Sequence, residues 1–81
     1  MSAEHAGGLN GAVVRQVKAE RAASGMTVDQ LAEASGIPVR SLVRYLNFER
    51  ELKLGMIDKL ASGLGMSPDV LVTRAIQERK S

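Results

Sequence analysis

The sequence predicts an all-α fold, a compact bundle of five helices. Tyr45 and Phe48 are the only aromatic residues, so the core must be built from Leu, Ile, Val, Met and Ala, a mixture that favours helices. Apolar residues recur at three- and four-residue steps, and Gly and Pro divide the chain into blocks of helical length. No stretch has the alternating pattern of a strand, and no internal repeat occurs.

The composition describes one soluble globular domain, since the chain has 81 residues, of which 44% are hydrophobic and 25% are charged. The absence of cysteine excludes a disulfide framework and a thiolate metal site, and it fits a reducing compartment. No stretch approaches the ~20 apolar residues of a membrane span, and the N-terminus lacks the pattern of a secretory signal. We therefore expect a cytoplasmic protein that does not associate with a membrane.

The spacing of the breaks predicts three regions: a flexible N-terminal arm over residues 1–9, a helical domain over residues 10–76 and a polar C-terminal tail over residues 77–81. The first helix is predicted from Asn10 to Ser24, because valines occur at helical spacing and Gly25 readily takes the left-handed conformation that ends a helix. These valines are Val13, Val14 and Val17.

A second and a third helix follow closely. Thr27 and Gln30 have the spacing of a capping box, which predicts a helix that starts there and runs to Ser35. Gly36 and Ile37 form a sharp turn, and Pro38 suits the first turn of a third helix, where its missing N–H has no partner to lose. That helix is predicted to end near residue 47.

A charged linker over residues 48–53 separates these helices from the last two. The fourth helix is predicted from apolar residues at three- and four-residue steps and is closed by Gly63 or Gly65; these apolar residues are Leu54, Ile57, Leu60, Ala61 and Leu64. Ser67 as the N-cap and Pro68 at the first helical position begin a fifth helix, which can run through Ile76.

The second and third blocks together form a helix-turn-helix pattern. A helix of about eight residues, a short turn and a helix of about ten share one apolar face, made by Leu31, Ala32, Ile37, Leu42 and Tyr45. The opposite face of the third block combines two arginines with two valines: Val39, Arg40, Val43 and Arg44. Arginine can donate two parallel hydrogen bonds to guanine, and a valine methyl group can lie against a thymine methyl group, so this face suits the major groove.

With these residues in place, the sequence resembles the Xre family of regulators, which includes the phage Cro and repressor DNA-binding domains. The resemblance extends from about Val17 to Leu71 and depends on the spacing of several short motifs: Val17-Lys18-Ala19-Glu20-Arg21, Gly25-Met26-Thr27, Leu31-Ala32, Gly36-Ile37, Leu42, Tyr45, Leu60-Ala61 and Leu64-Gly65. The resemblance implies a lambda-repressor-like bundle of five helices that binds double-stranded DNA and regulates transcription.

The resemblance also implies roles for single residues. The early outward residues of the third helix, Val39, Arg40, Val43 and Arg44, would contact bases. Backbone N–H groups at the start of the second helix and the segment after the third helix would contact phosphates. The residues expected at the DNA backbone are Thr27, Val28, Ser41, Asn47, Arg50 and Lys53.

Several residues depart from the family pattern. Val28 stands where many members have Gln, and Leu46 stands where many have Glu, which leaves Arg21 to pair with Glu33 or to face solvent. Phe48 stands where a glycine usually follows the third helix, so Asn47 is expected to adopt the left-handed conformation there.

One short recognition helix reads about half a site, so we expect a homodimer that binds a palindromic operator. The fifth helix is the expected interface, with Val72 and Ile76 as an exposed stripe and Val70 beside it; the alternative is that these residues seal the core. A protein-interaction module, such as an antitoxin or an adaptor that uses Val39 and Val43, remains the alternative function.

No pattern of catalytic, metal-binding or cofactor-binding residues emerges. His5 is the only histidine and has no second ligand beside it, and no base is placed to activate a serine. The sequence therefore predicts a protein that is not an enzyme and needs no metal and no cofactor.

Overall fold

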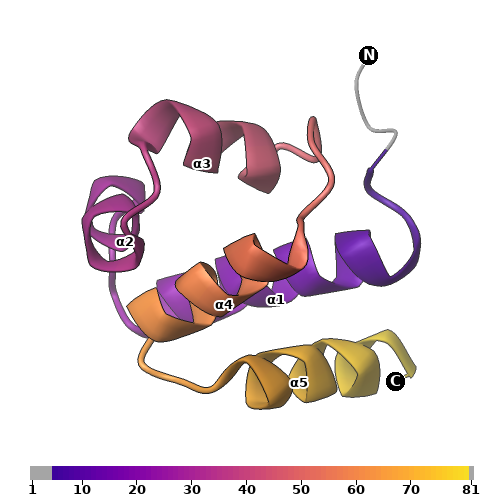
Figure 1. Ribbon diagram of the computed structural model, residues 1–81. Coiled ribbons are helices and arrows are strands. Elements are labelled where there is room, and N and C mark those ends of the chain that lie inside the picture. The colour runs from indigo at the N-terminus through magenta and orange to yellow at the C-terminus, as the bar shows by residue number, and fades with distance from the viewer. Residues whose placement is uncertain (1–4, 81) are drawn as a thin grey trace.

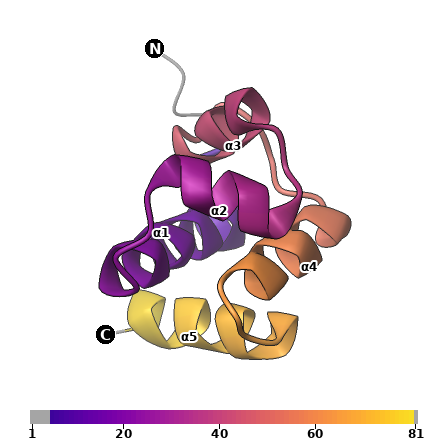
Figure 2. The ribbon, with the colours of Figure 1, turned by 90° about the vertical axis from the view of Figure 1, so that its left-hand side faces the viewer.

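The computed structural model describes residues 5–80 and has five α-helices in that range, with no β-strand (Figure 1). The helices are α1 (Gly8–Ala23), α2 (Val28–Ser35), α3 (Val39–Leu46), α4 (Leu54–Gly63) and α5 (Pro68–Lys80). The predicted all-α class and the predicted number of helices are confirmed. In two views at right angles, α3 lies at one end of the molecule and α5 at the other, with α1 and α4 between them (Figures 1 and 2).

The first and the last helix of the chain, α1 and α5, are both longer than the sequence predicts. Helix α1 begins at Gly8, two residues before Asn10, and α5 continues through residues 77–80, which were predicted as a tail. Residues 5–7 are held against α1, because the Asn10 side chain donates to the backbone oxygen of His5 at 2.7 Å and Arg15 donates to that of Ala6 at 2.9 Å. Of the predicted flexible arm, residues 1–4 lie outside the described residues.

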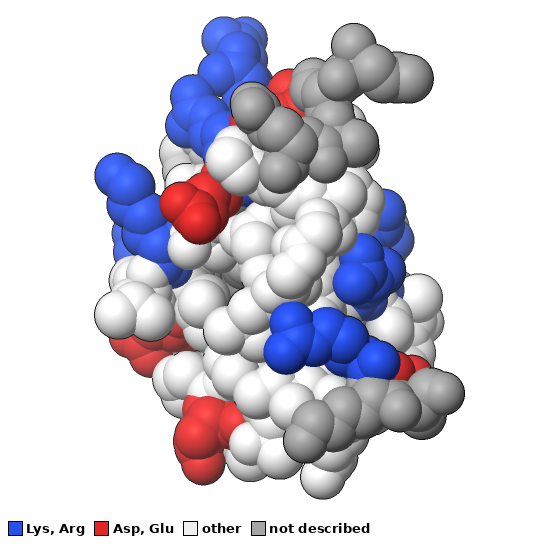
Figure 3. Space-filling view, turned by 90° about the vertical axis from the view of Figure 1, so that its right-hand side faces the viewer, with Lys and Arg blue, Asp and Glu red and all other residues white. Residues whose placement is uncertain are grey.

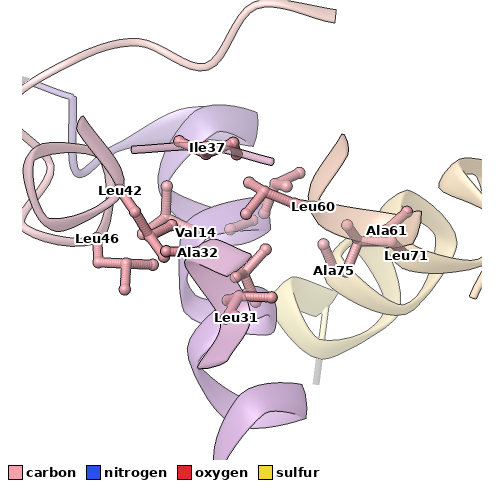
Figure 4. Packing of buried hydrophobic residues seen from close by; sticks show 13 residues of the cluster. Val14, Leu31, Ala32, Ile37, Leu42, Leu46, Leu60, Ala61, Leu71 and Ala75 are labelled. Atoms are coloured by element: carbon pink, nitrogen blue, oxygen red, sulfur yellow. The ribbon is translucent and has the colours of Figure 1, made fainter. Parts of the chain in front are cut away.

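The core consists of small and medium-sized aliphatic side chains from all five helices (Figure 4). Helix α1 packs along α5, and α2 packs against both α3 and α4. The largest fully buried side chains are those of Leu31, Leu42, Leu60 and Leu71, which come from four different helices. Because Leu42 belongs to α3 and Leu31 to α2, the helix-turn-helix unit is fixed to the bundle by the same core that holds the bundle together.

An ion pair ties the two longest helices together on the surface. Arg74 on α5 donates to the Glu20 carboxylate on α1 at 2.8 Å, and Gln16 donates to the same oxygen at 2.8 Å. These two hydrogen bonds lower the pKa of Glu20, the bond from Arg74 having the larger effect. The charged form of Glu20 is therefore favoured in the folded state.

The free energy of unfolding should decrease in acid as this contact is lost. A lowered folded-state pKa contributes stability above the ordinary glutamate pKa of about 4.5, and this stability is lost as the pH falls through the lowered value. Arg74 is half exposed, so the contribution should stay below about 1 kcal/mol. Urea titrations between pH 7 and pH 3 would measure it. Glu20→Gln should flatten the acid limb, whereas Glu51→Gln, an exposed site, should leave its shape unchanged.

Candidate nucleic-acid interface

The start of α2 is held by a complete capping box. The Thr27 hydroxyl accepts from the Gln30 amide at 3.1 Å, and the Gln30 side-chain oxygen accepts from the Thr27 amide at 2.8 Å. The helix ends at Gly36, which adopts a left-handed conformation with φ of 74° and so reverses the chain toward α3. Both features confirm what the residue types at these positions predict.

Helix α3 has one buried side and one exposed side. Leu42, Tyr45 and Leu46 are buried against the bundle. The side expected to face DNA is exposed; it comprises Val39, Arg40, Val43, Arg44 and Asn47. The two valines are 42% and 39% exposed. The predicted sidedness is therefore confirmed, while contact with bases remains a prediction.

The two ends of α3 differ in detail from the prediction. Pro38 is the N-cap residue and lies just outside the helix, because its ψ of 140° is extended rather than helical. This conformation leads the chain from the turn into the first helical residue, Val39. At the other end, Asn47 has φ of −92° and Phe48 takes the left-handed conformation with φ of 61°. The expectation that Asn47 would do so is wrong.

Tertiary contacts of Phe48 explain why a bulky residue adopts this conformation. Its ring packs against the core, and the Lys18 ammonium on α1 lies 5.2 Å from the ring centroid, a cation–π distance. The same ammonium donates to the backbone oxygen of Leu46 at 3.5 Å, at the C-terminal end of α3. Lys18 thereby holds the end of α3, and packing outweighs the local backbone cost of about 1–2 kcal/mol.

Two truncations at this position should separate the backbone cost from the packing. Phe48→Gly and Phe48→Ala both remove the ring, but only alanine keeps a Cβ in the left-handed region. We expect the alanine variant to be less stable than the glycine variant by about 1 kcal/mol, the reverse of the usual order for these two residues. Thermal and urea unfolding would measure the difference, and an alanine variant of equal or higher stability would contradict it.

Arg21 has a different partner from the one expected. Its guanidinium donates to the backbone oxygen of Met26 at 2.7 Å, so pairing with Glu33 or free exposure to solvent, the two expected outcomes, are both wrong. The reason is proximity: the chain turns back after α1 at Gly25 (φ of 71°), which brings the Met26 carbonyl to the last turn of α1. Arg21 therefore secures the connection that leads into the capping box.

The residues expected at the DNA backbone lie around α3. Thr27, Asn47, Arg50 and Lys53 are exposed, whereas Val28 and Ser41 are half-buried. The capping box engages the Thr27 amide, so the amides that lack an intrahelical partner at this helix end are those of Val28 and Asp29 in the first turn. Lys53 is the N-cap residue of α4, and its side chain forms no capping hydrogen bond.

A polar contact that the sequence does not reveal holds the segment after α3. The Asn10 side-chain oxygen accepts from the Leu52 amide at 2.7 Å, across 42 positions of the chain. Together with Lys18, Asn10 fixes both ends of the segment that carries Arg50 and Lys53. No local pattern marks either residue, because each acts on a partner that only the fold brings near.

The residues expected at a dimer interface are less exposed than predicted. Leu71 and Ala75 are fully buried, as expected, but Val72 and Ile76 are half-buried rather than exposed, because Val72 packs against the core. Val70 alone among the three candidates is exposed, at 37%.

The part of the chain that the structure describes contains neither a cluster of metal ligands nor a membrane-spanning helix. Between residues 5 and 80, no three His, Asp or Glu side chains come together in a way that would hold a metal ion. None of the described helices has the length and apolar character needed to cross a membrane.

Two solved structures have a similar architecture. Among solved structures, a point mutant of the restriction-modification controller protein C.Esp1396I matches with a TM-score of 0.86 and 23% identity, over 100% of this chain and 98% of the other. The clp gene regulator ClgR from C. glutamicum matches with a TM-score of 0.78 and 24% identity, over 89% of this chain and 94% of the other. At these identities the two matches show the shared fold. No curated protein sequence matches the chain.

A family model described as helix-turn-helix matches residues 17–71, which is more than half of the chain. The matched range begins and ends at the residues that delimit the resemblance noted above, and it contains the capping box, the left-handed Gly36 and the exposed face of α3. The chain therefore belongs to the Xre-like helix-turn-helix family of DNA-binding transcriptional regulators.

Proposed function

We propose that this protein is a sequence-specific regulator of the Cro or small-repressor type, which inserts α3 into the major groove of double-stranded DNA. The observation that carries the proposal is the exposed side of α3, where two arginines and two valines are accessible to solvent while the opposite side is buried in the core. A solvated helix would gain nothing from exposing valines, whereas a base-reading helix uses apolar and cationic groups together.

The spacing of the outward residues suits successive base pairs. Arg40 and Arg44 are four positions apart, so their guanidinium groups project from the same side of α3 one turn apart. Each can form two parallel hydrogen bonds with the O6 and N7 atoms of a guanine. Val39 and Val43 precede the arginines by one position each and offer methyl groups to thymine.

Phosphate contacts on both sides of α3 would orient it. The first turn of α2 offers the amides of Val28 and Asp29 at the positive end of a helix dipole. Beyond α3, Asn47, Arg50 and Lys53 would contact the DNA backbone, and Ser41 would do so from α3 itself. These contacts set the register of the protein on DNA and carry no sequence information of their own.

The two phosphate-contacting cations after α3 should affect all DNA alike. Arg50→Ala and Lys53→Ala should weaken binding to a duplex with one specific half-site and to random duplexes by similar factors, and each should reduce the slope of log Kd against log salt by about 0.9. Fluorescence anisotropy titrations at several salt concentrations would measure both effects. A loss confined to one DNA sequence would contradict the assignment, and Lys59→Ala, an exposed cation on α4, serves as the control.

A single recognition helix covers half a site, so the proposal includes a homodimer on a palindromic operator with half-sites about 10 base pairs apart. Selection of bound sequences from a random duplex library tests the whole proposal. Recovery of palindromes with that spacing would support DNA binding, specificity and two-fold symmetry together. Affinity weaker than about 10⁻⁵ M for every duplex at low salt would instead favour a protein-interaction module, an antitoxin or adaptor that uses the valine face of α3.

A further inference from the structure

An apolar hollow lies between the N-terminal ends of α1 and α4. Its volume is about 200 Å³, and its walls are mostly apolar; they comprise Leu9, Asn10, Val13, Glu51, Leu52, Leu54 and Ile57. The wall formed by the segment after α3 is held in place, because the Leu52 amide donates to Asn10. The hollow is therefore a built feature of the fold.

The volume of the hollow decides what kind of group it can take. Sites for small molecules are about 300–1,000 Å³ and contain several convergent polar groups. This hollow is smaller, and only Asn10 and Glu51 contribute polar side chains, the former already occupied by the Leu52 amide and the His5 carbonyl. It suits one apolar side chain that another protein surface supplies.

An exposed apolar side chain, that of Leu54, lies at the rim of the hollow. Leu54, the first residue of α4, is 86% exposed, the highest value among the exposed large hydrophobic residues of the described chain, and Leu9 on the opposite rim is 46% exposed. A single exposed leucine is ordinary on a protein surface, but a protruding leucine beside an apolar hollow forms a patch. The patch thus contains both a knob and a hole of matching chemistry.

We infer that this patch binds a second copy of the chain, with Leu54 of each copy seated in the hollow of the other. A two-fold axis requires one surface to be complementary to itself, and a knob beside its own hole meets that requirement. The charges beside the patch are complementary across such an axis. Lys53 adjoins Leu54 and Glu51 lines the hollow, so placing Leu54 in the partner's hollow brings each lysine toward the partner's glutamate.

The surroundings of the patch agree with this arrangement. The N-terminal end of α1 and the segment leading into α4 lie on the right in Figure 1, and the view of that side shows uncharged side chains across its middle with basic and acidic side chains around them (Figure 3). Helix α5 offers less apolar surface, because Leu71 and Ala75 are buried and Arg74 is paired with Glu20 on α1.

The position of the patch relates it to DNA binding, and in this respect the inference rests on the proposed function. Residues 47–53 run directly from the end of α3 to the hollow, and Asn10 and Lys18 fix both ends of that segment. A two-fold axis at the patch therefore holds two α3 helices at one spacing, which a palindrome with regularly spaced half-sites requires.

Sedimentation equilibrium of the protein alone tests the interface without DNA. The wild-type chain should pass from monomer to dimer with rising concentration, and Leu54→Glu should raise the dimer dissociation constant at least about tenfold. Glutamate suits the first turn of a helix, and the site is exposed, so the variant should fold; its thermal transition provides the check. Val70→Glu, in the first turn of α5, is the matched control and should dimerise like the wild type.

Charge exchange shows whether the partner is a second copy. Glu51→Lys and Lys53→Glu should each weaken the dimer, and the double exchange should restore it, because the two charges meet across the axis. The inference is overturned if the wild-type chain stays monomeric at every concentration, if Leu54→Glu dimerises normally, or if Val70→Glu alone breaks the dimer.

Binding to the selected palindrome separates failure of this inference from failure of the proposed function. Leu54→Gln, which adds no negative charge beside Lys53, should bind a duplex with one half-site as the wild type does, but lose at least about tenfold on the full palindrome. Equal affinity for the palindrome would overturn the inference and leave DNA binding intact. If neither protein binds any duplex, the proposed function fails, and sedimentation still decides whether the patch is an interface.

Discussion

Replacing Leu42 with alanine should lower the free energy of unfolding by about 2–5 kcal/mol, the largest stability loss that we expect from a single substitution in α3. Leu42 has no exposed surface, and it is the residue through which the middle of α3 meets the core. A chain of 81 residues has a total stability of about 4–12 kcal/mol, so the loss is a large fraction of the total and should lower the midpoint of thermal unfolding by several degrees or more. Urea unfolding followed by circular dichroism would measure the loss.

The neighbouring residue provides a matched control. Val43→Ala removes apolar atoms from the next position of the same helix, but on the exposed side, so the free energy of unfolding should change by less than about 0.5 kcal/mol. Its DNA affinity should fall nonetheless, if the proposed function holds, because the lost methyl groups would face thymine. A Leu42 variant as stable as the Val43 variant would show that α3 is not anchored through Leu42.

Replacing Arg40 or Arg44 with alanine should weaken binding to the selected operator by about 1–3 kcal/mol, or about 5- to 150-fold. The guanidinium groups carry the predicted hydrogen bonds to guanine, and their removal should relax the preference at one base position for each residue. Binding to random duplexes should weaken much less, by the loss of a single positive charge. Both side chains are exposed, so the folded structure and its thermal transition should be unchanged.

The comparison that decides this prediction is the ratio of specific to random binding. On duplexes with one half-site, Arg40→Ala and Arg44→Ala should reduce the ratio, whereas Arg50→Ala and Lys53→Ala should leave it constant while lowering both affinities. Equal losses on operator and random DNA for all four variants would refute base reading by α3. Repeating the random-library selection with each arginine variant should identify the base pair that the arginine contacts.

The elements that sequence reasoning located correctly are those whose causes are local. The capping box at Thr27 and Gln30, the left-handed Gly36 and the three-residue spacing of Leu42 and Tyr45 all act within a turn or two of the chain. Helix ends without such a signal were misplaced: α1 starts at Gly8, whose N-cap Gly7 forms no side-chain hydrogen bond, and α5 continues past residue 76.

In the candidate site, too, some features have local causes and others depend on tertiary contacts. The outward face of α3 followed from helical periodicity, since burial of one side determines the other. The left-handed conformation of Phe48 could not be predicted from the sequence, because local propensity favours asparagine or glycine in that conformation. Lys18, 30 positions away, reverses this preference because it contacts both the Phe48 ring and the C-terminal end of α3. The partner of Arg21 likewise depends on how the chain turns after α1.

By itself, the sequence determined the helical class, the helix-turn-helix unit and the residues that this unit exposes, because periodicity and capping act over a few neighbouring residues. Only the tertiary structure decided how the segment after α3 is held and where an apolar knob lies beside a matching hollow. Asn10 and Leu52 are 42 positions apart, as are Leu9 and Glu51 across the hollow. Contacts over such separations exist only once the bundle has brought the N-terminal ends of α1 and α4 together.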